Sequence, residues 1–235
     1  MNRRAVLRFL GAAAAATVAE LAARKAAHSD GGPRLFVFVP TSMGMLAFQK
    51  MLSEAMPGID VVAFGKFRDF ENGFADNPDA VLTLDPILKA RKLRSVVVGT
   101  NGGSPIEPFV LVSVGRAVEA AALTSVGAVD ILGRQGMKDL ITSLLGGSPK
   151  IERVTKEEDL LPLLQLSAVD AVLIPERIAN SFQARSKLDL RVTRTQGGIG
   201  LPALAVLTAA GGAVPQQVRR LEGRVAQEMG VAKWE

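Results

Sequence analysis

The chain has 235 residues, is 48% hydrophobic and carries a formal net charge of +5 at pH 7. This length and hydrophobic content are sufficient for a large α/β core, as one domain or as two small ones. Three of the five net positive charges come from Arg3, Arg4 and Arg8, and the chain has 5% aromatic residues and no tyrosine, so it lacks the basic surface and the stacking platforms of a nucleic-acid-binding protein.

Cysteine is absent and histidine occurs once, as His28. The sequence therefore has no disulfide, no thiolate nucleophile and no thiolate metal ligand, and we expect no lipoprotein anchor. His28 falls in the linker 24–33, so neither a histidine-centred catalytic triad nor a histidine-based metal site is expected. The Walker pattern Gly-x-x-x-x-Gly-Lys-Ser/Thr is also absent. We expect no catalytic residue, no metal and no cofactor.

Paired arginines stand ahead of an apolar run in Asn2-Arg3-Arg4-Ala5-Val6-Leu7-Arg8, which continues into 9–18. The run is too short and too rich in alanine to span a membrane. The stretch resembles a twin-arginine export signal. Asn2 and Val6 depart from that pattern, so the Sec route is an alternative.

Cleavage is expected at Thr17-Val18-Ala19, with Leu21-Ala22-Ala23 as a second candidate. We expect an export signal peptide over 1–19, a linker over 20–33 and a periplasmic location for the remainder. An amphipathic first helix is the competing interpretation of the same residues.

After the linker, apolar runs alternate with segments of helical periodicity. The expected strands are 34–39, 59–64, 79–84, 95–99 and 106–113, and the expected helices are 44–56, 68–74 and a segment that begins at Pro86. The same alternation continues in the second half. There the expected strands are 126–132, 151–154, 170–174, 190–195 and 201–207, and the expected helices begin at Gln135, Lys156 and after Pro175, with a closing helix over 215–227.

One short sequence occurs in both halves, as Asp79-Ala80-Val81-Leu82 and as Asp170-Ala171-Val172-Leu173. Each copy predicts a buried strand, followed by a helix whose first turn contains Pro86 or Pro175. The order β-α-β-α-β-α therefore occurs twice, which favours an α/β fold of two similar lobes with a ligand cleft between them over one undivided sheet.

The chain is expected to cross between the two lobes twice. We place the first lobe at 34–113 and 200–235 and the second at 114–199, with the first crossing near Ser113 to Ala117. Gln196-Gly197-Gly198-Ile199-Gly200 is either a ligand contact or a hinge near the second crossing.

Two groups of residues stand where strands lead into helices. Thr41 and Ser42 precede the helix expected over 44–56, and a helix N-terminus is a ready anion site, although plain capping is the alternative. Arg134 has a glycine on each side, at Gly133 and Gly136, so it is either a forked donor to a carboxylate or phosphate or an exposed arginine on a turn.

The twofold order, the leader, the Phe74 to Thr83 stretch and the entry from Gly127 to Met137 together resemble a type 2 periplasmic solute-binding protein, closest in layout to phosphate- and phosphonate-binding members. The resemblance implies a cleft that closes on a small solute for an ABC permease. It maps the ligand contacts onto hydroxyls, glycines and cations at the strand ends: Thr41, Ser42, Gly65, Lys66, Thr83, Ser113, Arg134, Gln135, Gly136 and Pro175.

Hydroxyls, backbone amides and one arginine suit a small anion, such as an oxyanion or a small carboxylate. We expect a monomer that binds this solute and no nucleic acid. An enzyme on the same fold, with Asp85 and Glu176 as a carboxylate pair, is the first alternative. A ligand-binding subunit of a sensor is the second.

Overall fold

The computed structural model describes residues 32–235, so the predicted leader 1–19 lies outside the described residues. None of the helices in the described part is both long enough and apolar enough to cross a membrane.

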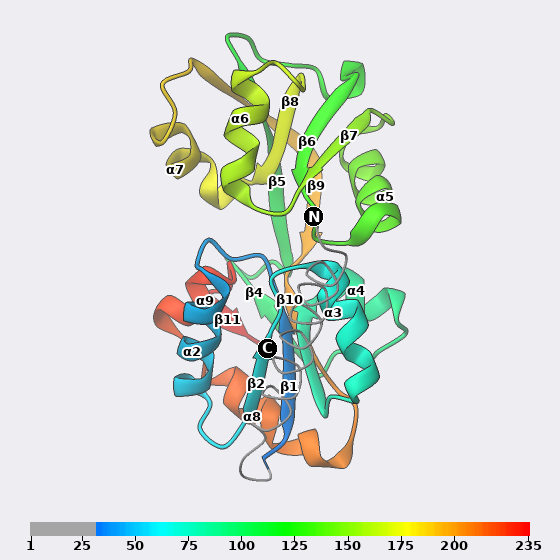
Figure 1. The fold of residues 1–235 in the computed structure, drawn as a ribbon, viewed down its shortest axis with the longest axis vertical. Coiled ribbons are helices and arrows are strands. Elements are labelled where there is room, and N and C mark those ends of the chain that lie inside the picture. The colour runs from blue at the N-terminus through cyan, green and yellow to red at the C-terminus, as the bar shows by residue number, and fades with distance from the viewer. Residues whose placement is uncertain (1–31) are drawn as a thin grey trace, which may run out of the picture. The chain divides into compact units, whose positions relative to one another are not determined.

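Six strands form the first sheet, in the order β11-β4-β10-β3-β1-β2 (Figure 1). Strand β1 pairs in parallel with β2 and β3, whereas β10 is antiparallel to both β3 and β4. The bounds of these strands are β1 Arg34–Phe38, β2 Asp60–Ala63, β3 Ala80–Leu84, β4 Val97–Thr100, β10 Pro202–Val206 and β11 Lys233–Trp234.

Five strands form the second sheet, in the order β7-β6-β8-β5-β9. Strand β6 pairs in parallel with β7 and β8, and β5 is antiparallel to both β8 and β9. The bounds are β5 Ile106–Val114, β6 Ser125–Val129, β7 Lys150–Val154, β8 Ala171–Pro175 and β9 Leu190–Gly200.

The two sheets repeat one topology. In each, the first strand of the β-α-β-α-β-α unit is flanked by the other two in parallel, and an antiparallel strand pairs with the third. The register also repeats, because Ala80 pairs with Leu35 and Ala171 pairs with Val126. The predicted α/β fold of two similar lobes is confirmed, and the two Asp-Ala-Val-Leu copies occupy equivalent strands.

The helices of the first unit follow its strands as predicted: α2 Met45–Ala55, α3 Phe67–Gly73 and α4 Asp85–Ala90. Those of the second unit are α5 Gly133–Leu145, α6 Leu160–Gln165 and α7 Ala179–Ala184. The closing helix differs from the prediction, since it is divided into α8 Val214–Arg219 and α9 Gly223–Glu228. Between them the carbonyl of Leu221 accepts a hydrogen bond from Nε1 of Trp234 at 3.1 Å, which joins this break to β11.

The first change of sheet comes earlier than expected. The sequence predicts that the strand 106–113 belongs to the first lobe, but β5 pairs along its length with β9, and in part with β8, in the second sheet. The connection between sheets therefore lies between Thr100 and Ile106, before the crossing expected near Ser113 to Ala117. An apolar strand carries no local information about which sheet it will join. The return from β9 to β10, at Leu201, lies next to the predicted boundary at residue 200.

Apolar packing continues from one sheet to the other. Phe38 and Leu84 of the first sheet share a hydrophobic cluster with Met137 and Leu173, which belong to the second half of the chain. Beneath Phe38, Phe70 is fully buried and stacks on it with ring centroids 5.3 Å apart. Apolar side chains from both sheets therefore belong to one hydrophobic cluster.

Candidate functional site

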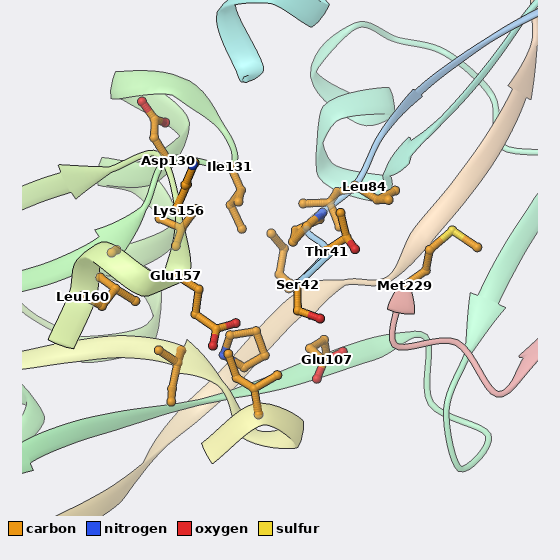
Figure 2. A pocket seen from close by; sticks show the side chains of 18 of the residues that line it. Thr41, Ser42, Leu84, Glu107, Asp130, Ile131, Lys156, Glu157, Leu160 and Met229 are labelled. Atoms are coloured by element: carbon orange, nitrogen blue, oxygen red, sulfur yellow. The ribbon is translucent and has the colours of Figure 1, made fainter. Parts of the chain in front are cut away.

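A cavity of about 340 Å³ lies at the carboxyl ends of the parallel strands of both sheets. Its wall includes Leu84 at the end of β3 and Pro175 at the end of β8, which are equivalent positions in the two units. Figure 2 shows Thr41 and Met229 on one side of it and Ile131 and Lys156 on the other. In open α/β sheets this edge is where ligands bind.

The wall is mostly apolar. Four methionines contribute to it, Met43, Met45, Met137 and Met229, together with branched side chains and prolines from both sheets. Methionine is unbranched and polarisable, so it adapts to irregular apolar surfaces. A wall of this kind favours a solute with an apolar body.

The charged side chains of the wall are nearly balanced in sign. Four are acidic and three are basic: Glu107, Asp130, Glu157, Glu158, Lys156, Arg177 and Arg185. Arg185 is engaged twice, because it forms an ion pair with Glu157 through Nη2 and donates from Nε to the carbonyl of Ser181 at 3.3 Å. The cavity therefore has no excess of positive charge that would draw in a highly charged anion.

Glu107 and Arg177 form an ion pair within this wall. Nε of Arg177 donates to Oε2 of Glu107 at 3.2 Å, and the side chains of Glu107 and Arg177 are 8% and 27% exposed. Burial raises the pKa of Glu107 above its ordinary value, although the nearby Arg177 opposes this shift. The pair lies against Gly230, where an added Cβ would be 2.5 Å from Oε2 of Glu107 and 2.8 Å from Nε of Arg177.

Asp130 stands where β6 ends. Its Oδ2 accepts a hydrogen bond from Nη1 of Arg153 at 2.6 Å, while Oδ1 is buried and has no hydrogen-bond partner among the described residues. Figure 2 shows the carboxylate directed away from Ser42 on the opposite wall. The negative charge of Asp130 is therefore paired with Arg153, and its carboxylate does not point towards the opposite wall.

The predicted residues Thr41 and Ser42 line the cavity. Oγ1 of Thr41 and Oγ of Ser42 both donate to Oε2 of Glu228, at 3.1 and 2.9 Å. Neither caps α2, whose N-cap is Gly44 and makes no side-chain cap bond. The hydroxyls instead tie the loop after β1 to the end of α9, next to Met229 in the cavity wall. Their role as ligand contacts stays a prediction.

Gly65 and Pro175, which the resemblance also selected, line the cavity, whereas Thr83 and Ser113 do not. Oγ1 of the fully buried Thr83 donates to the carbonyl of Phe38 at 2.7 Å, and Oγ of Ser113 donates to the carbonyl of Arg116 at 2.6 Å. Both hydroxyls thus stabilise backbone within a sheet or turn. Successive side chains of a strand point to opposite faces of the sheet, and the sequence pattern did not indicate which face these two hydroxyls would occupy.

The remaining predicted contacts, Lys66, Arg134, Gln135 and Gly136, are also absent from the cavity wall. Lys66 is the N-cap residue of α3 and is exposed. Arg134 is exposed in the first turn of α5, and Nε2 of Gln135 donates to Asp139 at 2.7 Å. An added Cβ at Gly136 would be 2.7 Å from that of Leu132, so the glycine allows close packing there.

The carboxylate pair of the enzyme alternative is not assembled in the cavity. Asp85 forms an ion pair with Lys89 at 2.6 Å, and Glu176 forms one with Arg194 at 3.1 Å. Neither acid lines the cavity wall. Among residues 32–235, no group of three or more histidine, cysteine, aspartate or glutamate side chains could hold a metal ion.

Sequence reasoning missed Arg177, Glu107 and Glu228. Arg177 had a local indication, because it comes two residues after the second Asp-Ala-Val-Leu-Ile-Pro strand and so had to lie near the strand ends. Glu107 and Glu228 had none. Glu107 reaches the cavity wall through pairing of β5 with β8. Glu228 lies outside the wall but accepts hydrogen bonds from the wall residues Thr41 and Ser42, because α9 packs beside the loop after β1.

No protein-family model matches this sequence, and no curated protein sequence matches it. Solved structures do match in fold. XAC2383 from Xanthomonas citri bound to ATP has a TM-score of 0.57 at 12% identity, over 87% of this chain and 91% of that chain. The amino acid ABC transporter substrate-binding protein AbpA from Streptococcus pneumoniae, bound to L-arginine, has a TM-score of 0.54 at 15% identity, over 88% and 96%.

The GluR0 ligand-binding core in complex with L-glutamate has a TM-score of 0.54 at 13% identity, over 86% of this chain and 98% of that chain. Identities this low establish fold alone. Together with the repeated topology and the cavity at the strand ends, these structural matches show that this chain has the two-lobed, type 2 periplasmic-binding-protein-like fold.

Proposed function

We propose that this chain is a solute-binding protein that captures one small solute in the cavity between its two sheets. The observation that carries the proposal is the cavity itself, which is lined from both sheets at the carboxyl ends of their parallel strands. A solute there contacts both lobes at once, so it stabilises their closed arrangement relative to an open one.

The solute is proposed to be a small carboxylate with an apolar body, such as an amino acid with an apolar side chain. The apolar wall and the balanced charges favour this class over the phosphate-like oxyanion that the sequence resemblance suggested. L-arginine and L-glutamate, the solutes of two structural neighbours, are both carboxylates, whereas ATP, the solute of a third, is a polyphosphate.

An ABC importer is the proposed destination of the solute. Support comes from the neighbour named as an amino acid ABC transporter substrate-binding protein and from the export signal expected over 1–19. We propose a periplasmic, monomeric protein from which residues 1–19 are removed. The proposed lobes follow the sheets, with the crossings between Thr100 and Ile106 and at Leu201.

A thermal-shift screen of the purified full chain tests this function. The panel contains L-leucine, L-methionine, L-arginine, L-glutamate, inorganic phosphate and ATP. A bound solute at 100 times its Kd stabilises the fold by about 2.7 kcal/mol, which raises Tm by about 5 to 10 °C for a chain of this size. We expect this shift with an apolar amino acid.

Two glycine variants provide the matched control. Gly44 lines the cavity and Gly212 does not, and at both an added Cβ meets nothing within 4 Å. Gly44→Trp is expected to abolish the shift, and Gly212→Trp is expected to retain it. If no solute in the panel shifts Tm, or if Gly44→Trp retains the shift, binding in this cavity is refuted.

A further inference from the structure

We propose that Arg177 binds the carboxylate of the solute and that Glu107 is the positioning residue that holds Arg177 for this task. The inference rests on the proposed function and identifies which side chain of the cavity recognises the anionic group. It also differs from the expectation drawn from the sequence, in which Arg134 supplies the forked donor.

The first support is the set of donors that Arg177 has available. Its Nε donates to Glu107, and among residues 32–235 neither Nη1 nor Nη2 makes a hydrogen bond or an ion pair. A guanidinium presents its donors in a planar fork that matches a carboxylate with two parallel hydrogen bonds. Nη1 and Nη2 of Arg177 therefore remain available to donate hydrogen bonds to a carboxylate.

The second support is that Glu107 and Gly230 restrict the orientation of the Arg177 side chain. Glu107 is on β5 and Arg177 follows β8, and these strands pair directly, so both side chains start from fixed backbone. Gly230 closes the space behind the pair, since even a methyl group there would overlap both side chains. A guanidinium held at Nε and blocked on one side has few orientations left, which reduces the entropy lost when a solute binds.

The third support comes from comparing the three cations of the wall. Arg177 has the more buried arginine side chain, 27% exposed against 45% for Arg185. Nε and Nη2 of Arg185 are already engaged by Ser181 and Glu157. Lys156 has a flexible stem that ends in a single ammonium group without a fork. Arg177 thus combines partial burial, free donors and a fixed position.

The surroundings of Arg177 also fit the apolar body of the proposed solute. Phe109, Pro175 and Ile178 also line the cavity. Pro175 and Ile178 are close to Arg177 in the sequence, and Phe109 of β5 pairs with Pro175 of β8. A charged hydrogen bond next to such side chains is stronger than one in water because the local dielectric is lower. The geometry therefore favours a monocarboxylate whose apolar part lies against these residues.

The test measures how strongly the protein prefers an acid over its neutral amide. Kd values are determined by isothermal titration calorimetry at pH 7 for 4-methylpentanoate against 4-methylpentanamide and for L-leucine against L-leucinamide. The full chain is compared with Arg177→Gln, Arg177→Lys and Arg134→Gln. We expect the unmodified chain to prefer at least one acid by about 10- to 100-fold, the range of charge-assisted hydrogen bonds.

Arg177→Gln is expected to lose this preference while binding of the matching amide changes little. Arg177→Lys should retain only part of this preference, since lysine keeps the charge but not the fork. If Arg177→Gln does not fold, Arg177→Lys provides the test. Arg134→Gln should bind like the unmodified chain. A preference that survives in both Arg177 variants, or that disappears in Arg134→Gln, overturns the inference.

The same measurements separate this inference from the proposed function. Equal binding of acids and amides by the unmodified chain means that the cavity binds solutes without recognising a carboxylate, which overturns the role of Arg177 alone. If neither the acids nor the amides bind, and the solute screen above is also negative, the proposed function fails and the inference fails with it.

Discussion

The carboxylates of Asp79 and Asp170 occupy equivalent places in the two sheets. Oδ2 of Asp79 accepts a hydrogen bond from the backbone amide of Arg34 at 2.9 Å, and Oδ2 of Asp170 accepts one from that of Ser125 at 2.9 Å. Arg34 and Ser125 are the first residues of β1 and β6, the strands in the middle of each parallel set. The aspartate of each repeat therefore fastens the start of its neighbouring strand.

Substitution of Asp170 should destabilise the fold. Asp170 accepts three hydrogen bonds, from the amides of Thr124 and Ser125 and from Oγ1 of Thr124. We expect Asp170→Ala to lower the free energy of unfolding by about 1 kcal/mol, because these donors can in part bind water instead. Urea denaturation measures the change. The exposed Asp189, whose side-chain partner is Arg191, is the control, and an equal loss in Asp189→Ala would refute the role.

Acid should remove the contribution of both aspartates. The hydrogen bond from Thr208 is the main cause that lowers the pKa of Asp79, and the hydrogen bond from Thr124 is the main cause that lowers the pKa of Asp170. A lowered folded pKa gives stability above the unfolded value, near pH 4, that is lost as pH falls through the folded value.

The double variant Asp79→Asn, Asp170→Asn is therefore expected to lose less stability than the unmodified chain between about pH 4 and pH 2. Tm measured across this range provides the comparison. Parallel Tm curves for the two proteins would show that neither carboxylate has a lowered pKa in the folded state.

Glu107 should make stability depend on pH in the opposite direction from the two aspartates. Burial raises its folded pKa, and the nearby charge of Glu176 adds to the shift, although Arg177 opposes it. The stability linked to this group is complete below the unfolded value, near pH 4, and is lost as pH rises through the folded value. Compared with Glu107→Gln, the unmodified chain should therefore lose relative stability as pH rises above about 4. A pH-independent difference in unfolding free energy would contradict this.

Gly230 should tolerate no side chain. Its φ is +73°, and an added Cβ would overlap both Glu107 and Arg177. Gly103 has a similar φ of +78° with open space around it, so Gly103→Ala measures backbone strain alone. We expect Gly230→Ala to cost about 1 to 3 kcal/mol more than Gly103→Ala, because it also displaces the ion pair.

Chemical denaturation of the two alanine variants measures this difference. Gly230→Ala should also weaken the preference for an acid over its amide, whereas Gly103→Ala should retain it. Equal stability losses in the two variants would mean that the ion pair adjusts to the extra methyl group without cost.

Local patterns in the sequence predict the class of the fold and the order of its strands and helices. Apolar runs such as 34–39 and the helical spacing over 44–56 are local properties, and they correspond to β1 and α2 within a residue or two. The repeated Asp-Ala-Val-Leu correctly indicated two similar units, because a duplicated unit repeats its strand order and register. Turn residues and periodicity act over a few positions, so a single sequence displays them.

Long-range strand pairing determines which of the remaining side chains face the cavity. Arg177 and Glu107 are 70 residues apart, and Thr41 and Glu228 are 187 apart. Such pairs depend on which strands become neighbours, as when β5 joined the second sheet, and on which face of a strand each side chain occupies. Long-range pairing therefore placed Arg177 in the cavity wall and left Arg134 outside it, although both arginines follow a strand in the sequence.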